Sequence, residues 1–166
     1  MTTNQVKIAW ASSADLEEIL DLQRLCYQSE AALYNDYSIP PLRESLAELM
    51  EQLRSAIILK GMEEGRIVGS VRAEISDGTC SIGRLIVHPD DQNQGIGKRL
   101  MAAIEQAFPT ARRYELFTGY RSTKNLSLYH KLGYREFRRK AVSGTLTLVC
   151  LQKTPTANNR GTDIER

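Results

Sequence analysis

Apolar residues recur along the chain with two different periods, which predict alternating strands and helices. Short apolar or alternating runs predict strands, because successive side chains of a strand point to opposite faces of a sheet. Seven such runs cover residues 6–10, 56–62, 66–75, 79–88, 114–118, 134–142 and 145–152. Apolar residues spaced three and four apart predict four helices, over residues 12–29, 42–53, 96–108 and 125–133.

The order of these elements indicates the fold class. Strand, helix, helix, three strands, helix, strand, helix and two strands predict an α/β (α+β) domain, with a mixed, mostly antiparallel twisted sheet of about seven strands and about four flanking helices. Asp77-Gly78 is a hairpin signal before the strand at 79–88. The sheet should turn parallel where the helix at 96–108 crosses over.

Two segments lack a periodic pattern. Residues 31–41, which end in Ile39-Pro40-Pro41, are expected to be an irregular connection. Residues 154–166 are polar and have no apolar periodicity, so we expect a disordered tail after a single domain spanning residues 1–153.

Composition limits the classes of function. The 166 residues carry a net charge of +2, which gives no electrostatic argument for nucleic acid or a membrane surface as partner. The three cysteines lie in apolar runs, as reduced thiols do, and no metal-ligand spacing is present. There is no leader-like start and no apolar run near 18 residues, so the expected location is cytoplasmic.

A polar loop with Gly95 and Gly97 joins the strand ending at Val87 to the helix that begins at Ile96. A helix N-terminus has unpaired N–H groups and partial positive charge, so such a loop is suited to binding phosphate. A P-loop needs Ser or Thr where Arg99 stands, and a dinucleotide fingerprint needs a small residue where the chain has Leu100.

A second signal is the segment that runs from Asn125 to Tyr134. Asn125 and Tyr129 are four residues apart and therefore lie on one face of the predicted helix, while Gly133 suits the left-handed position that closes it. By itself this pattern also fits a core tyrosine beside a capping asparagine.

Together, Gln-x-x-Gly-x-Gly at residues 92–97 and the later helix ending in Leu-Gly-Tyr resemble the two signatures of the GNAT superfamily of N-acetyltransferases, over residues 55–140. The resemblance implies acetyl-CoA as cofactor and a V-shaped opening between the strands that end at Val87 and Thr118. The cofactor-binding residues that it implies are Leu85, Ile86, Val87, Gln92, Asn93, Gln94, Gly95, Ile96, Gly97, Lys98, Asn125 and Tyr129.

The chemistry of amide formation assigns further roles. Tyr129 can donate its phenolic proton to the departing thiolate. The resemblance implies that a backbone N–H near Ile86 or Val87 polarises the carbonyl. Family members often carry Glu or His where this chain has Ser81 and Gly83, so no direct base stands there.

Carboxylates elsewhere are the remaining candidates for the base. They are Glu74 and Glu115 on the third and fifth predicted strands and Asp36 in the irregular connection, acting directly or through water. Tyr34, Asp36 and Tyr37 are expected to wall the acceptor pocket, because the resemblance puts this connection over that pocket. The alternative is a plain linker packed by its tyrosines.

The leading hypothesis is therefore an N-acetyltransferase that moves an acetyl group directly from CoA to a primary amine of a small molecule. Two alternatives stay open: acetylation of a protein or peptide amine, and a non-catalytic acyl-CoA sensor with the same fold. The expected partners include no nucleic acid and no membrane, and the sequence is compatible with a monomer or a homodimer.

Overall fold

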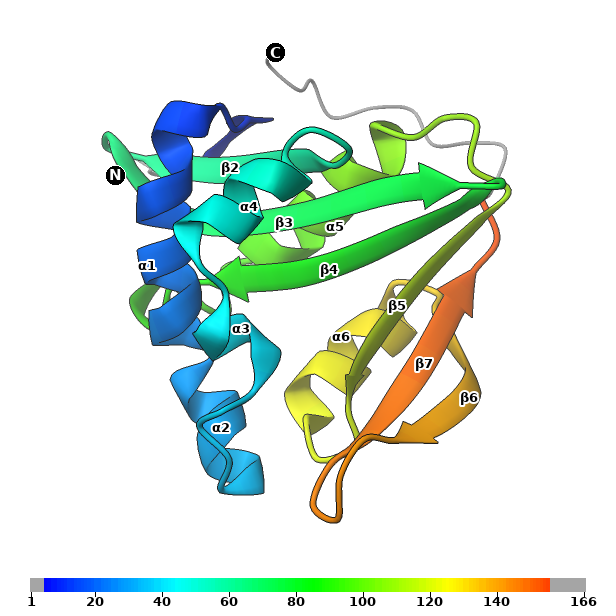
Figure 1. The fold of residues 1–166 in the computed structure, drawn as a ribbon. Helices are drawn as coiled ribbons and strands as arrows, with labels where there is room; N and C mark the ends of the chain where they lie inside the picture. The colour runs from blue at the N-terminus through cyan, green and yellow to red at the C-terminus, as the bar shows by residue number, and fades with distance from the viewer. Residues whose placement is uncertain (1–4, 156–166) are drawn as a thin grey trace.

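A single sheet of seven strands forms the centre of the computed structural model, which describes residues 5–155 (Figure 1). The strands are β1 (Lys7–Trp10), β2 (Ile57–Glu63), β3 (Arg66–Ser76), β4 (Thr79–Val87), β5 (Arg113–Gly119), β6 (Arg135–Ala141) and β7 (Thr147–Lys153). Their spatial order is β1-β2-β3-β4-β5-β7-β6, and all neighbours are antiparallel except β4 and β5. The predicted mixed, mostly antiparallel sheet is confirmed.

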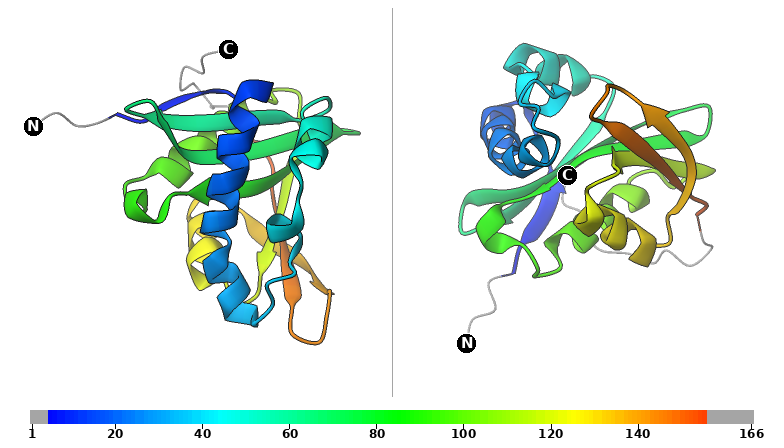
Figure 2. Two further views of the ribbon diagram at one scale, coloured as in Figure 1. Left: turned by 60° about the vertical axis from the view of Figure 1, so that its left-hand side comes forward. Right: turned by 90° about the horizontal axis from the view of Figure 1, so that it is seen from below.

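Helices cover both faces of this sheet (Figure 2). They are α1 (Leu16–Cys26), α2 (Gln28–Tyr34), α3 (Pro40–Arg43), α4 (Leu46–Gln52), α5 (Ile96–Gln106) and α6 (Thr123–Lys131), with short 3-10 turns at Ser13–Asp15 and Pro89–Asp91. The group α1–α4 lies on one face, and α5 and α6 lie on the other. This arrangement leaves the end of β4 and the start of α5 accessible between the two groups.

The connection between the first two predicted helices is more regular than expected. Residues 28–34 continue as α2, which closes at Asn35 with a left-handed φ of 49°, and Pro40 starts α3 because its fixed φ suits a first helical turn. The helix expected over 42–53 is divided, because Ser45 caps α4 by accepting a hydrogen bond from the Glu48 N–H at 3.1 Å. Only 35–39 remain irregular, and 156–166 of the expected tail lie outside the described residues.

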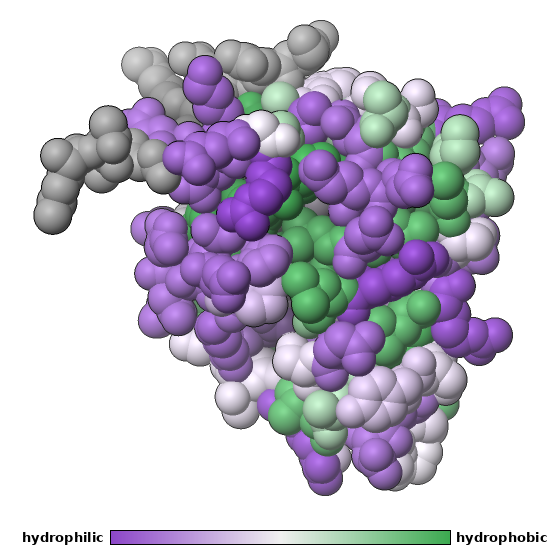
Figure 3. Space-filling model, turned by 90° about the vertical axis from the view of Figure 1, so that its left-hand side faces the viewer, coloured by the Kyte–Doolittle hydropathy of each residue, from purple (hydrophilic) through white to green (hydrophobic). Residues whose placement is uncertain are grey.

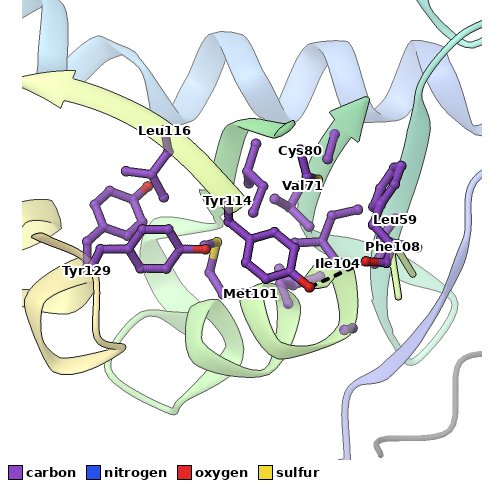
Figure 4. Packing of buried hydrophobic residues seen from close by; sticks show 14 of the residues in the cluster. Leu59, Val71, Cys80, Met101, Ile104, Phe108, Tyr114, Leu116 and Tyr129 are labelled. Atoms are coloured by element: carbon purple, nitrogen blue, oxygen red, sulfur yellow. Dashed lines mark hydrogen bonds between the residues drawn. The ribbon is translucent and has the colours of Figure 1, made fainter. Parts of the chain in front are cut away.

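The core has one apolar layer on each face of the sheet. On the α5 face, Leu100, Met101 and Ile104 are fully buried in the layer that packs α5 against β2, β3 and β4. Tyr129 enters the same layer from α6, and the Tyr114 hydroxyl is anchored in it by hydrogen bonds to the carbonyls of Glu105 in α5 and Phe108 just after it (Figure 4). The face of the molecule that carries α1 is covered mainly by hydrophilic residues, with smaller hydrophobic groups between them (Figure 3).

The two strands at the centre of the sheet separate soon after they begin. Residues 79–81 of β4 pair with residues 113–115 of β5, and beyond that point the strands diverge (Figure 1). A bulge helps to bend β4 away: the register with β3 shifts between Ser70 and Arg72, and Arg84 on β4 has a left-handed φ of 51°. The expected V-shaped opening is therefore present.

Helix α2 is tied to the far arm of this V. The Tyr34 hydroxyl accepts a hydrogen bond from the Arg121 N–H at 2.9 Å, and the Ser122 hydroxyl donates to Glu30 at 2.6 Å. Tyr34 is 4% exposed and lies so close to Gly119 that a Cβ there would overlap its hydroxyl. The absence of a side chain at position 119 is thus what lets α2 dock.

We predict that Gly119→Ala destabilises the protein by about 1–3 kcal/mol, as overpacking of a buried site does. Gly83→Ala is the matched control, because a Cβ on that strand glycine would meet nothing within 4 Å. Urea unfolding should show the loss only for Gly119→Ala, and the loss should disappear in a Tyr34→Ala background. Equal stability of the two glycine variants would contradict the contact.

Candidate active site

A cleft with a volume of about 690 Å³ lies where β4 and β5 diverge. Four parts of the chain line it: the junction of α1 and α2, the end of β4, the loop into α5, and the β5–α6 connection with α6. The paired ends of β4 and β5 hold these walls in place. Segments far apart in the sequence are thereby brought around one cavity.

The loop into α5 forms the polar end of the cleft. Its lining residues are Gln92, Asn93, Gly95, Ile96, Gly97 and Lys98, whereas Gln94 is not among them. Asn93 and Gly95 have left-handed φ values of 64° and 81°, which turn the backbone sharply into the helix. The first N–H groups of α5 have no carbonyl partner within the helix, so they are free to bind an anion.

Lysines stand at the rim beside these donors. Lys98 and Lys124 line the cleft, and Lys124 donates a hydrogen bond of 2.8 Å to the side-chain oxygen of Gln92. Arg99 is directed elsewhere, because its guanidinium donates to the Val6 carbonyl at 2.6 Å. Lys98 and Lys124 therefore place positive charge beside the loop.

The middle of the cleft is mostly apolar. Leu85, Ile86 and Val87 form one wall, and Asn125 and Leu128 lie on the α6 side. The Asn125 side-chain amide also donates to the Thr118 hydroxyl of β5 at 3.4 Å, which fixes its orientation. The structure thus brings the β4 residues and Asn125 together, as expected from the sequence.

Tyr129 lies in the core next to the cleft and is 7% exposed. Its ring packs edge-on against Tyr134, with a distance of 6.1 Å between centroids. Burial raises the pKa of the Tyr129 phenol well above its ordinary value, and the nearby Tyr27 and Glu30, which line the cleft, raise it further. The phenol consequently keeps its proton across the working range of an enzyme.

The carboxylates expected as bases do not line the cleft. Glu74 and Glu115 flank Ser81 in one row across β3, β4 and β5, at the end where the strands are still paired. Glu74 is exposed and accepts a hydrogen bond from Ser55 at 3.3 Å, whereas Glu115 forms an ion pair with Arg113. Both residues lie on the strands on which they were expected, β3 and β5, but away from the cavity.

The residues expected to wall the acceptor pocket are also placed elsewhere. Tyr34 ties α2 to the β5–α6 connection, and Tyr37 is 58% exposed. Asp36 accepts hydrogen bonds from Ser38, at 2.9 Å from its backbone nitrogen, and these bonds lower the pKa of the carboxyl. None of the three lines the cleft, and the tyrosine contacts agree better with the alternative of a packed linker.

Five lining residues from the α1–α2 junction were not foreseen: Cys26, Tyr27, Ser29, Glu30 and Leu33. They lie about 60 positions before the β4 wall, and no local pattern marks them. Burial raises the pKa of the Cys26 thiol to about 11, and the thiol donates to the Val87 carbonyl at 3.3 Å. Cys26 is therefore a neutral wall residue, and the fully buried Cys80, with its pKa raised to about 12, is equally unsuited as a nucleophile.

The arrangement fits an elongated ligand with a phosphate end. Backbone donors and lysines line one part of the cleft, and apolar side chains and the Glu30 carboxylate line another. The protonated Tyr129 phenol lies beside the cleft but is not among its lining residues. Across residues 5–155, no group of three or more His, Cys, Asp or Glu side chains could hold a metal ion. No helix in the same range is both long and apolar enough to span a membrane.

Comparison with known proteins agrees with this geometry. Residues 54–136 match the family model for the acetyltransferase (GNAT) domain. UPF0157 protein YqkA from Bacillus subtilis is 29% identical over 133 residues, which are 80% of this chain but only 38% of that relative. The chain thus spans about two fifths of the length of this curated relative.

Solved structures share the fold across nearly the whole chain. PaiA N-acetyltransferase from Thermoplasma acidophilum, in complex with coenzyme A, has a TM-score of 0.76 and 18% identity over 91% of this chain and 99% of its own. YncA from Salmonella typhimurium, with acetyl-CoA, has a TM-score of 0.69 and 20% identity over 96% and 98%. Ribosomal-protein-alanine N-acetyltransferase from Brucella melitensis has a TM-score of 0.70 and 18% identity over 89% and 99%. The chain belongs to the GNAT acetyltransferase family, as its two motifs indicated.

We predict that Gly95→Ala weakens binding of coenzyme A at least tenfold, because a side chain at a φ of 81° strains the loop that presents the backbone donors. Gly65→Ala is the matched control, since Gly65 has a similar φ of 76° and equally open surroundings in the β2–β3 turn. Calorimetric titration of both variants should show the loss of affinity only at position 95. Equal affinities of the two variants for coenzyme A would contradict binding of the cofactor by this loop.

Proposed function

We propose that the protein is an acetyl-CoA-dependent N-acetyltransferase that transfers the acetyl group directly to a primary amine of a small molecule. The observation that carries this proposal is the continuous cleft between the diverging strands, which leads from the N-terminus of α5 to the vicinity of Tyr129 and Glu30. Membership of the GNAT family supports the reaction type.

In this proposal the loop holds the cofactor by its phosphates. The backbone N–H groups of residues 93–98 bind the diphosphate, Lys98 and Lys124 meet the outer phosphate, and Asn125 contacts the pantetheine arm. Lys124 exchanges its hydrogen bond with Gln92 for this contact. Acetyl-CoA itself supplies an acetyl group activated as a thioester.

The residues at the inner end of the cleft then carry the transfer. A backbone N–H of Ile86 or Val87 polarises the carbonyl oxygen, and Tyr129 gives its proton to the sulfur as the carbon–sulfur bond breaks. The raised pKa of the phenol keeps that proton in place until a thiolate forms. Neither Cys26 nor Cys80 takes the acetyl group, because both thiols stay protonated.

A base must also remove a proton from the amine, since a lysine-like amine with a pKa of about 10 is charged at neutral pH. We assign this role to Glu30, directly or through a water molecule, because it lines the cleft and lies near the Tyr129 phenol. Its hydrogen bond from Ser122 holds the carboxylate in position. Glu30 replaces Glu74, Glu115 and Asp36 as the candidate.

A protein or peptide acceptor is the second candidate, because one neighbour with this fold is a ribosomal-protein-alanine N-acetyltransferase. A screen of amines and peptides for acetyl-CoA-dependent thiol release separates the two candidates. Turnover on small amines supports the proposal, whereas turnover restricted to peptides contradicts the small-molecule acceptor. Saturable cofactor binding without turnover on any acceptor would indicate a sensor.

We expect Tyr129→Phe to lower kcat by roughly 10²- to 10⁴-fold, the usual contribution of a general acid, while leaving acetyl-CoA affinity within a factor of about three. Tyr134→Phe is the control, because that hydroxyl donates to Glu105 and neither residue lines the cleft. Steady-state kinetics and cofactor titration measure the two effects. Unchanged turnover in Tyr129→Phe would contradict the role of Tyr129 as general acid.

We expect Glu30→Gln to lower kcat/KM for the amine by roughly 10²-fold, with the largest loss below the pKa of the amine, where proton removal limits the rate. Glutamine keeps the size of the side chain and can still accept the Ser122 hydrogen bond. Glu74→Gln and Glu115→Gln should retain full activity in the same thiol-release assay. Loss of activity in either control, with Glu30→Gln active, would return the role to the strand carboxylates.

A further inference from the structure

Helix α2 presents a carboxylate and an apolar side chain to the cleft. Its lining residues are Ser29, Glu30 and Leu33, and the three positions between Glu30 and Leu33 put these two one turn apart on the same side of the helix. The other side of α2 is buried through Ala31 and Tyr34, which are 0% and 4% exposed. A group bound at the Glu30 carboxylate therefore has Leu33 as its neighbour along α2.

The Leu33 side chain is apolar but remains open to solvent. It is 43% exposed, and among the large hydrophobic residues that are exposed in residues 5–155 it alone lines the cleft. Its backbone is held in place, because the Leu33 carbonyl accepts a hydrogen bond from the Arg121 guanidinium at 3.3 Å and the next residue, Tyr34, ties α2 to the β5–α6 connection. An apolar group of a ligand that covered Leu33 would remove this surface from water, which is favourable.

The charges around the cleft suit a ligand with one ammonium group. Within the described part of the chain, its lining carboxylates are Glu30 and Asp91, and Asp91 is 9% exposed and already faces the Arg66 guanidinium at 3.8 Å. Four lining side chains are cationic: Lys98, Arg121, Lys124 and Lys131. A ligand with several ammonium groups would thus meet one available carboxylate and an excess of like charge.

We propose that the acceptor is a monoamine with an apolar body, an alkylamine or aralkylamine, and that Leu33 is the residue that selects it. This inference rests on the function proposed above, in which Glu30 takes a proton from the amine. With the nitrogen at Glu30, the carbon chain next to it lies against Leu33, one helical turn away. Polyamines are disfavoured, because a second ammonium group would exchange water for the leucine side chain and find no carboxylate there.

The test uses matched amines in the thiol-release assay: ethylamine, butylamine and hexylamine vary the chain length, and 1,6-diaminohexane adds only a second amine to hexylamine. In the wild-type protein, kcat/KM should rise roughly 2- to 4-fold with each added methylene, the usual effect of burying a CH2 group. Hexylamine should exceed 1,6-diaminohexane by roughly 10-fold or more, because the second ammonium group is desolvated without a partner.

Variants at two exposed leucines identify the residue responsible. Leu33→Ala should lower kcat/KM for hexylamine by roughly 3- to 10-fold and leave ethylamine, whose chain is too short to cover the side chain, unchanged. Leu33→Glu supplies a second carboxylate and should invert the preference in favour of 1,6-diaminohexane. Leu25→Ala and Leu25→Glu are the matched controls and should keep the wild-type preferences, because Leu25 is 47% exposed but does not line the cleft. Neither leucine is buried, so all four variants should keep the wild-type melting temperature.

Titrations of coenzyme A alone, and of the same amines in its presence, distinguish this inference from the proposed function. Binding of hexylamine that depends on Leu33 but leads to no transfer would support the apolar site and overturn the proposed reaction. Transfer to hexylamine that is equal in wild type and Leu33→Ala would support the reaction and overturn the apolar site. Loss of coenzyme A affinity in Leu33→Ala would assign this side chain to the cofactor and overturn its role in selecting the acceptor. Absence of any binding or turnover with hexylamine would overturn that role as well.

Discussion

The whole site depends on an interruption of backbone pairing in the middle of the sheet. β4 and β5 pair only over the short parallel stretch at residues 79–81 and 113–115. Beyond it, the backbone N–H and C=O groups on the facing edges of the two strands need other hydrogen-bond partners. On β5 the opposite edge stays fully paired with β7. On β4 the Val87 carbonyl accepts hydrogen bonds from Cys26 and Gln92, so side chains replace the missing strand.

This interruption explains why the reactive groups come from distant parts of the chain. An intact ladder would fill the space with backbone, whereas the open V admits the α1–α2 junction from one face and the N-termini of α5 and α6 from the other. The bulge at Arg84 adds to the opening and turns one cation toward α1. Binding of phosphate, a thioester and an amine can thus be assigned to separate walls of one cavity.

Local features of the site were predictable, and non-local ones were not. The loop of residues 92–98 and the position of Asn125 follow from glycine placement and helical spacing, which act over a few residues. Glu74 and Glu115 show the limit: the pattern identifies the strands that carry them, but the point where β4 and β5 diverge decides which positions reach the cavity. That Tyr27 and Glu30 line the cleft could not be foreseen, because it depends on how α2 docks across the V.

The division of residues 28–52 into three helices has a similar cause. Apolar spacing identified the buried faces of these helices. Their boundaries are set by the left-handed Asn35 and by the Ser45 cap. Each is the effect of a single residue, which a pattern averaged over many residues does not reveal. The strands were better predicted, since alternation over five or more residues leaves few registers that bury the apolar side.

Two links cross the V, one between α2 and the β5–α6 connection and one between Lys124 and Gln92, and they differ in how easily they break. The link between α2 and the β5–α6 connection includes the buried Tyr34 hydroxyl, whereas the link between Lys124 and Gln92 at the rim is solvent-exposed and easily exchanged for water or a ligand oxygen. Because β5 is held by strand pairing at its start and by α2 at its end, widening of the cleft is confined to the rim beside Lys124 and Gln92. A long coenzyme can therefore thread in and leave through that rim while the geometry around the reacting atoms stays unchanged.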